Sequence, residues 1–192
     1  METNIETLCI RPLRADARRN RDKLLSAATA AFAQDGEAVA LEAVAARAGV
    51  GIGTLYRRFP SKELLIEATY RREVQDLCDA ALDLSASRPP QDALRAWMEL
   101  FLDFMATKHG MADALRVVLT DETERLETRA QLAAAIDHLL TAGASQSVTR
   151  PHVDARDVLM ALGGISLITA TERRPDLAAR LIDLLLHGVL TS

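Results

Sequence analysis

The chain has 192 residues, of which 49% are hydrophobic and 26% are charged. This composition is typical of a folded globular protein and excludes a disordered or fibrous one. We find no run of the roughly 18 apolar residues that a membrane-spanning helix requires, and no basic start followed by an apolar run, as in a signal peptide. Cys9 and Cys78 lack CxxC spacing. We therefore expect a cytoplasmic protein without a metal site or a disulfide framework.

The charge is distributed unevenly along the chain. The formal net charge is -4, yet residues 11–62 hold ten Arg or Lys against five Asp or Glu. A basic segment joined to an acidic remainder is typical of a localised anion-binding surface. Charge alone is equally compatible with an ordinary solvated helix face, so the interpretation depends on where the helices lie.

Apolar residues recur at helical spacing through most of the chain, and no segment alternates as a strand would. Residues 1–15 show no sustained period and are predicted to be a flexible basic arm. Helices are predicted over residues 16–35, 41–48, 52–59, 62–84, 90–109, 115–119, 126–142, 154–171 and 175–190, with breaks at glycines and prolines between them. The predicted fold is all-α, with about nine helices.

The short helices at about residues 40–59 have the plan of a helix-turn-helix, in which the second helix enters the major groove of DNA. Gly49 stands where the turn requires a left-handed backbone. On the second helix, burial of Leu55 and Phe59 leaves four side chains facing outward: Thr54, Tyr56, Arg57 and Arg58. Such side chains can contact base edges and phosphates.

The segment from Leu24 to Ala68 resembles the DNA-binding domain of the TetR/AcrR family. The matching positions are Ala27, Ala28, Phe32, Gly36, Val44, Ala45, Ala48, Gly49, Val50, Gly53, Thr54, Leu55, Tyr56, Phe59, Lys62, Glu63, Leu64 and Leu65. The resemblance implies DNA contacts by Thr54, Tyr56 and Lys62, with Gly53 beside them. It also implies that Arg18, Arg19 and Arg21 touch the DNA backbone. Ala40 departs from the family's usual Ser or Thr cap, which puts one phosphate contact in doubt.

By the same resemblance, residues 16–76 form the DNA-binding domain and residues 77–192 form a domain that binds a ligand and dimerises. The expected pocket residues are Trp97, Met98, Phe101, Phe104, Met105, Met111 and Leu115. The expected dimer-interface residues, on the last two helices, are Val158, Leu162, Ile165, Leu181 and Leu185. The alternative for both groups is that they are core residues of a monomer. An apolar pocket favours a neutral or lipophilic effector.

The predicted function is a sequence-specific transcriptional regulator, a repressor that a small-molecule effector releases from a pseudo-palindromic operator. The alternative is a DNA-binding regulator or architectural protein that has no small-molecule ligand and is switched by a protein partner. An enzyme is not expected: the segment Gly49 to Gly53 lacks the preceding strand and the following Lys-Ser or Lys-Thr of a nucleotide loop. The four histidines are scattered, so we expect no metal and no cofactor.

Overall fold

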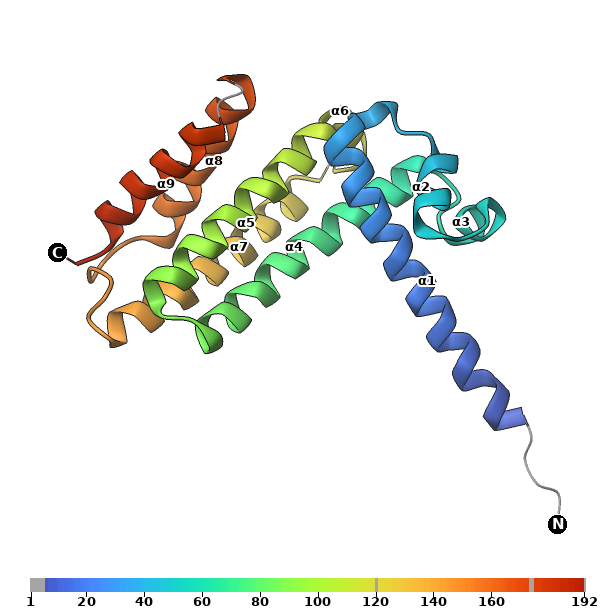
Figure 1. The fold of residues 1–192 in the computed structure, drawn as a ribbon, viewed down its shortest axis with the longest axis horizontal. Coiled ribbons are helices and arrows are strands. Elements are labelled where there is room, and N and C mark those ends of the chain that lie inside the picture. The colour runs from blue at the N-terminus through green and yellow to red at the C-terminus, as the bar shows by residue number, and fades with distance from the viewer. Residues whose placement is uncertain (1–5, 120, 173–174, 192) are drawn as a thin grey trace, which may run out of the picture.

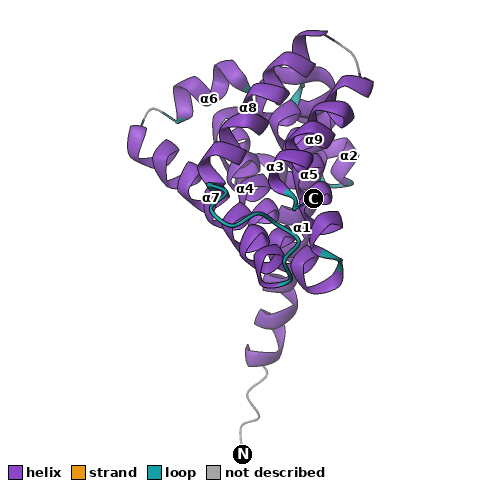
Figure 2. Ribbon diagram, turned by 90° about the vertical axis from the view of Figure 1, so that its left-hand side faces the viewer, coloured by secondary structure: helices purple, strands orange, loops and turns teal. Residues whose placement is uncertain are grey.

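The computed structural model describes residues 6–119, 121–172 and 175–191, except for the side chains of residues 6–15, 37, 171, 172 and 175 (Figure 1). Within these ranges the chain forms nine α-helices and one short 3-10 helix, and no strand occurs there. Loops are confined to the junctions between helices (Figure 2). The all-α prediction is therefore confirmed.

The helices follow one another with short connections. They are α1 (Glu6–Asp35), the 3-10 helix η1 (Gly36–Ala38), α2 (Leu41–Ala48), α3 (Ile52–Arg58), α4 (Lys62–Ser87), α5 (Pro90–Gly110), α6 (Ala112–Val118), α7 (Glu122–Ser145), α8 (Ala155–Glu172) and α9 (Pro175–Val189). One expectation is corrected. Residues 6–15, predicted to be a flexible arm, continue α1 as a helix, while residues 1–5 of that arm lie outside the described residues.

The helices divide between two ends of an elongated molecule (Figure 1). Helices α4, α5 and α7 pack along one another, and α8 and α9 pack together against α5 at one end. Helices α1, α2 and α3 gather at the other end, where α1 contacts both α4 and α5. None of the described helices is long and apolar enough to cross a membrane.

Local sequence explains where the short helices begin and end. Gly49 adopts a left-handed backbone with φ 67°, and its N–H donates to the carbonyls at the end of α2. Ser61 caps α4 by accepting a hydrogen bond from the Leu64 N–H. Ala40 precedes α2 without any side-chain cap, as its methyl side chain dictates. These signals fix the angle between α2 and α3 and hence the exposed face of α3.

The end of α1 touches the end of α5 backbone to backbone. A Cβ on Gly110 would overlap the carbonyl oxygen of Phe32, and a Cβ on Gly36 would lie 3.3 Å from the Gly110 carbonyl oxygen. Gly36 also has φ 59°, a left-handed conformation that side chains disfavour. Two glycines therefore allow the approach that joins the two ends of the molecule.

We predict that Gly110→Ala lowers the free energy of unfolding by about 1–3 kcal/mol, because the added methyl group meets a backbone carbonyl that cannot rotate away. Urea unfolding at fixed protein concentration measures this change. The matched control is Gly188→Ala in α9, where a Cβ would meet nothing within 4 Å. That substitution should leave stability unchanged or raise it by roughly 0.5–1 kcal/mol. Equal effects of the two substitutions would contradict the close α1–α5 contact.

Candidate DNA-binding surface and effector cavity

Helix α3 presents the polar face that the sequence predicted. Leu55 is fully buried beneath it. Gly53, Tyr56, Arg57 and Arg58 are exposed, and Thr54 is half-buried. The Arg57 guanidinium donates a hydrogen bond to the Thr54 hydroxyl at 3.1 Å. An exposed Tyr–Arg–Arg run on a short helix can donate hydrogen bonds to phosphates and to base edges.

Helix α1 adds a second group of cations beside α3. A hollow of about 380 Å³ lies between the two helices and brings Arg21 together with Thr54, Arg57 and Arg58. Arg19 lines a separate hollow, between α1 and α2, with Lys23 and Arg47, and it forms an ion pair with Asp16. Arg18 is exposed on α1 but lines neither hollow. Of the three predicted arginines of α1, the structure thus brings Arg21 beside α3, while Arg19 lies beside the end of α2.

Sequence reasoning did not single out Lys23 and Arg47, which line the hollow between α1 and α2 together with Arg19. Arg47 is exposed in the last turn of α2 and donates a hydrogen bond to the Gln34 side chain at 3.3 Å. Its sequence signal is weak because a basic residue is common near any helix C-terminus.

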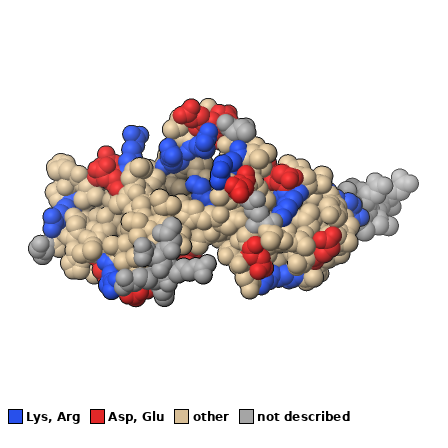
Figure 3. All heavy atoms as spheres, turned by 90° about the horizontal axis from the view of Figure 1, so that it is seen from above, with Lys and Arg blue, Asp and Glu red and all other residues tan. Residues whose placement is uncertain are grey.

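Lys and Arg side chains also gather near the middle of the molecule, away from its two ends, on the face shown in Figure 3.

Lys62 has a structural contact in addition to its predicted role at DNA. Its ammonium donates a hydrogen bond to the Val39 carbonyl at 2.8 Å, and the side chain is half-buried. The bond ties the start of α4 to the residues just before α2. Any phosphate contact by Lys62 would therefore be made by a side chain that this bond already orients.

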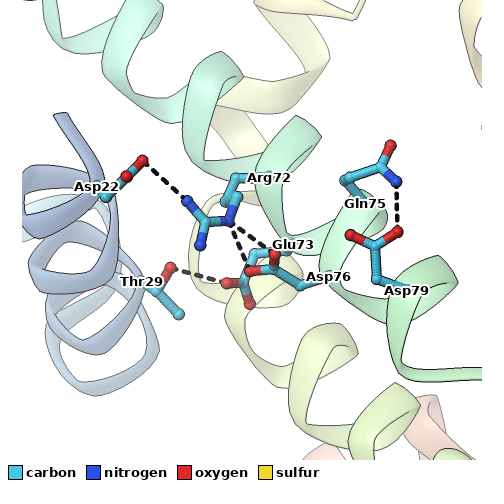
Figure 4. Close-up of polar contacts among 7 residues, drawn as sticks. All are labelled: Asp22, Thr29, Arg72, Glu73, Gln75, Asp76 and Asp79. Carbon is cyan, nitrogen blue, oxygen red and sulfur yellow. Dashed lines mark hydrogen bonds and ion pairs between the residues drawn. The ribbon is translucent and has the colours of Figure 1, made fainter. Parts of the chain in front are cut away.

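Polar side chains join α1 to α4 (Figure 4). The Arg72 guanidinium reaches Asp76 at 2.7 Å on its own helix and Asp22 at 3.2 Å on α1. The Thr29 hydroxyl donates to the Glu73 carboxylate at 2.9 Å. Burial raises the pKa of Glu73 above its ordinary value, and the Thr29 hydrogen bond only partly offsets this. These contacts attach α4 to the helix that supports α3.

A cavity of about 400 Å³ lies among α4, α5, α7 and α8. It is lined by Tyr70, Phe101, Phe104, Met105, Lys108, Arg125, Thr128, Arg129, Leu132, Leu159, Met160, Gly163, Gly164 and Leu167. Phe101, Phe104 and Met105 were expected here. The other four predicted residues, Trp97, Met98, Met111 and Leu115, are buried in the core and do not line it. The Trp97 indole instead donates to the Leu77 carbonyl at 2.8 Å.

The cavity differs from the expected apolar pocket because Lys108, Arg125 and Arg129 also line it. Burial, and secondly the charge of Arg129, lower the pKa of Lys108. Burial also raises the pKa of Tyr70. A sequence signal for these cations existed in the i, i+4 spacing of Arg125 and Arg129, but nothing local placed Lys108 opposite them.

The surface of α8 and α9 also differs from expectation. Val158, Leu162 and Ile165 are buried within the chain itself, and Leu181 and Leu185 are half-buried. The large apolar side chains that these helices expose are Met160, Leu167, Ile168 and Leu184. The three predicted residues of α8 therefore pack inside the subunit, on a helix that contacts α5 and α7, whereas the two on α9 remain partly exposed. Among the described residues, no group of three or more His, Cys, Asp or Glu could hold a metal ion.

Two family models match the chain. The model described as bacterial regulatory proteins, tetR family, matches residues 24–69. The model for the C-terminal domain of SbtR-like transcriptional regulators matches residues 89–191.

Curated relatives and solved structures agree with these matches. The HTH-type transcriptional repressor KstR of Mycolicibacterium smegmatis is 37% identical over 141 residues, which cover 71% of this chain and 66% of that protein. KstR of Mycobacterium tuberculosis is 38% identical over 64% of this chain, and the chain spans only 54% of its length. The solved TetR regulator SCO0520 from Streptomyces coelicolor is 43% identical, with TM-score 0.81, over 90% of this chain and 99% of that one. A TetR regulator structure from Mycobacterium vanbaalenii is 31% identical, with TM-score 0.76, over 94% and 100% of the two chains.

We predict that Glu73→Gln stabilises the protein most at neutral pH. A carboxyl whose pKa is raised by folding costs stability above that pKa, and the cost disappears as pH falls through it toward the ordinary value of 4.5. The stability difference between variant and wild type should therefore shrink as pH falls from 7.5 toward about 4.5. Urea unfolding at several pH values measures the difference. Glu127→Gln, at an exposed position, removes the same charge, and an identical pH profile for both variants would contradict the interpretation.

Proposed function

The chain belongs to the TetR family of bacterial regulatory proteins, and on that basis we propose that it is a repressor released from its operator by a small-molecule effector. It would bind a pseudo-palindromic operator as a homodimer, in the cytoplasm. The observation that carries this proposal is the position of the cavity: on both α4 and α5, a residue of its wall and a residue that contacts α1 lie within one helical turn of each other.

The DNA contacts are assigned to α3 and the neighbouring part of α1. The second helix of a helix-turn-helix lies in the major groove, with its exposed residues against base edges. Tyr56, Arg57 and Arg58 are exposed on that helix, and Arg21 lies beside Arg57 and Arg58 across the hollow between α1 and α3. Arg21 would therefore bind the phosphate backbone next to the groove that α3 enters.

Effector binding would reach this surface through α4 and α5. On α4, Tyr70 lines the cavity, and two residues later Arg72 is paired with Asp22 of α1. On α5, Lys108 lines the cavity, and two residues later Gly110 touches Phe32 of α1. A shift of either helix about a bound ligand would therefore move α1 and the α3 that it supports. The ligand can lower the DNA affinity by no more than the ratio of its own affinities for the conformation that does not bind DNA and the one that does.

Homodimerisation is assigned to the apolar surface of α8 and α9. Met160, Leu167, Ile168 and Leu184 are between 49% and 72% exposed there, which is unusual for large apolar side chains grouped on two adjacent helices. A second copy related by a two-fold axis would cover them on both subunits. It would also set two α3 helices about 34–36 Å apart, or at a multiple of that distance, as successive major grooves require.

The alternative without a small molecule, in which a protein partner switches the regulator, is less well supported. A C-terminal domain whose side chains leave no cavity would have favoured this alternative. The cavity among α4, α5, α7 and α8 instead leaves about 400 Å³, which is within the range of ligand sites in proteins.

We predict that Arg57→Ala lowers the affinity for the operator by about tenfold or more, since a direct contact to a base is worth roughly 1–3 kcal/mol. Arg21→Ala should weaken binding to all duplexes and reduce the salt slope by about one. Fluorescence anisotropy across a salt series measures both, using the DNA upstream of its own gene and duplexes selected from a random pool.

The matched control is Arg88→Ala, at an exposed position between α4 and α5, in the domain opposite α3. It should leave the affinity unchanged. If both the Arg57 and the Arg21 variants bind DNA with the affinity of the wild type, the assigned DNA surface is contradicted. Failure of the wild-type protein to prefer any duplex would contradict the repressor proposal itself.

We predict that Leu184→Glu converts the dimer to a monomer, because it places a charge within an apolar interface. Sedimentation velocity measures the oligomeric state. The control is Leu82→Glu on α4, where a leucine is exposed to a similar degree, 56% against 69% for Leu184, but outside the proposed interface. Loss of the dimer in both variants, or in neither, would contradict the assigned interface.

A further inference from the structure

The cavity is lined by apolar side chains together with three cations. Phe101, Phe104, Leu132 and Leu159 supply apolar side chains from three helices. Lys108 from α5 and Arg125 and Arg129 from α7 supply three positive charges, and none of the fourteen lining residues is Asp or Glu. A cavity for a neutral ligand has no need of this charge, since desolvating a cation costs free energy.

These cations are not balanced by acidic side chains. No ion pair in the described part of the chain joins Lys108, Arg125 or Arg129 to a carboxylate. The nearby Arg71 behaves differently, since it pairs with Glu67 at 2.6 Å and with Glu124 at 3.0 Å. Glu124 directly precedes Arg125 yet turns to Arg71. Arg71, just outside the cavity, is thus paired with carboxylates, whereas the three cations that line the cavity are not.

Lys108 is the innermost of the three charges. Its side chain is half-buried, whereas Arg125 and Arg129 are exposed at the rim. The ammonium lies 5.9 Å from the centre of the Tyr70 ring, at the limit of a cation–π contact, which compensates only part of the desolvation. The lowered pKa of Lys108 has the same cause. An anion in the cavity would restore the missing partner.

Hydroxyl groups stand next to these cations. Tyr70 and Thr128, which both carry hydroxyl groups, line the cavity. An oxygen anion near Lys108 would therefore find an ammonium and hydroxyl donors in a cavity that aromatic rings also line.

We propose that the effector is an organic anion: an apolar body held among Phe101, Phe104 and Leu132, with a carboxylate held by Lys108 and by Arg125 or Arg129. This inference rests on the proposed function, because it takes the cavity to be the effector site. It replaces the neutral or lipophilic effector that the sequence favoured. The volume of about 400 Å³ suits a medium-chain or aryl carboxylate better than a large polycyclic molecule.

The test compares probes that differ only in the head group. Octanoate, decanoate, dodecanoate and phenylbutanoate are titrated into the full-length protein by calorimetry in the absence of DNA, each against its primary alcohol. We expect at least one carboxylate to bind about tenfold or more tightly than its alcohol, as one charge-assisted hydrogen bond predicts. Equal binding of acid and alcohol, or no binding by any carboxylate, would overturn the proposal.

Two variants place the binding in the cavity. Lys108→Met and Arg129→Met remove one charge each and keep an unbranched side chain, and Lys108→Met should fold at least as stably because the desolvation cost disappears. Each should reduce the preference for the carboxylate several-fold, whereas Arg88→Met, the exposed control, should leave it intact. A preference that survives both cavity variants would show that the anion binds elsewhere and would overturn the assignment.

Release of DNA is measured separately, so that the two proposals fail separately. If decanoate binds in the Lys108-dependent manner but leaves operator affinity unchanged, the anion site stands and the effector-released repressor does not. If a neutral molecule releases the operator while no carboxylate binds, the repressor stands and the anion site does not.

Discussion

The architecture depends on one close approach of two backbones, at which Gly110 of α5 meets the Phe32 carbonyl of α1. Because there is no side chain on either glycine of the pair Gly36 and Gly110, the end of α1 can pack directly against α5. A contact between backbone atoms cannot be relieved by rotating a side chain. Helix α5 therefore acts as the fixed support on which the α1–α3 unit rests.

The attachment of α1 to α4 is of a different kind. Beside their packing in the core, the two helices are joined by the Arg72–Asp22 ion pair at 3.2 Å and the Thr29–Glu73 hydrogen bond at 2.9 Å, between partly exposed side chains. Such contacts are worth about 0–1 kcal/mol each and can re-form after a small slide. Because these side-chain contacts can re-form whereas the backbone contact cannot, a displacement of Tyr70 by a ligand would move α1 relative to α4 about the Gly110 contact.

Apart from residues 6–15, the sequence was sufficient to predict the helices and the exposed face of α3, because glycine turns, caps and helical periodicity are local signals. Gly49 and the burial of Leu55 are examples, and both are as predicted. The sequence was insufficient for predicting which residues line the cavity and which are exposed on α8, because both depend on packing between distant segments. Trp97 and Phe101 lie one turn apart on α5, yet only Phe101 lines the cavity. Val158 and Leu162 are as apolar as Met160, and only the packing of α8 decides which of them are buried.

Met160 and Leu167 belong both to the wall of the cavity and to the exposed surface of α8 assigned to the second subunit. Any ligand that displaces these two side chains also reshapes the surface on which subunits associate. Thermodynamic linkage then requires that subunit association change the ligand's dissociation constant by the same factor as the ligand changes subunit association. Cellular abundance of the protein would accordingly set the concentration of effector at which transcription responds.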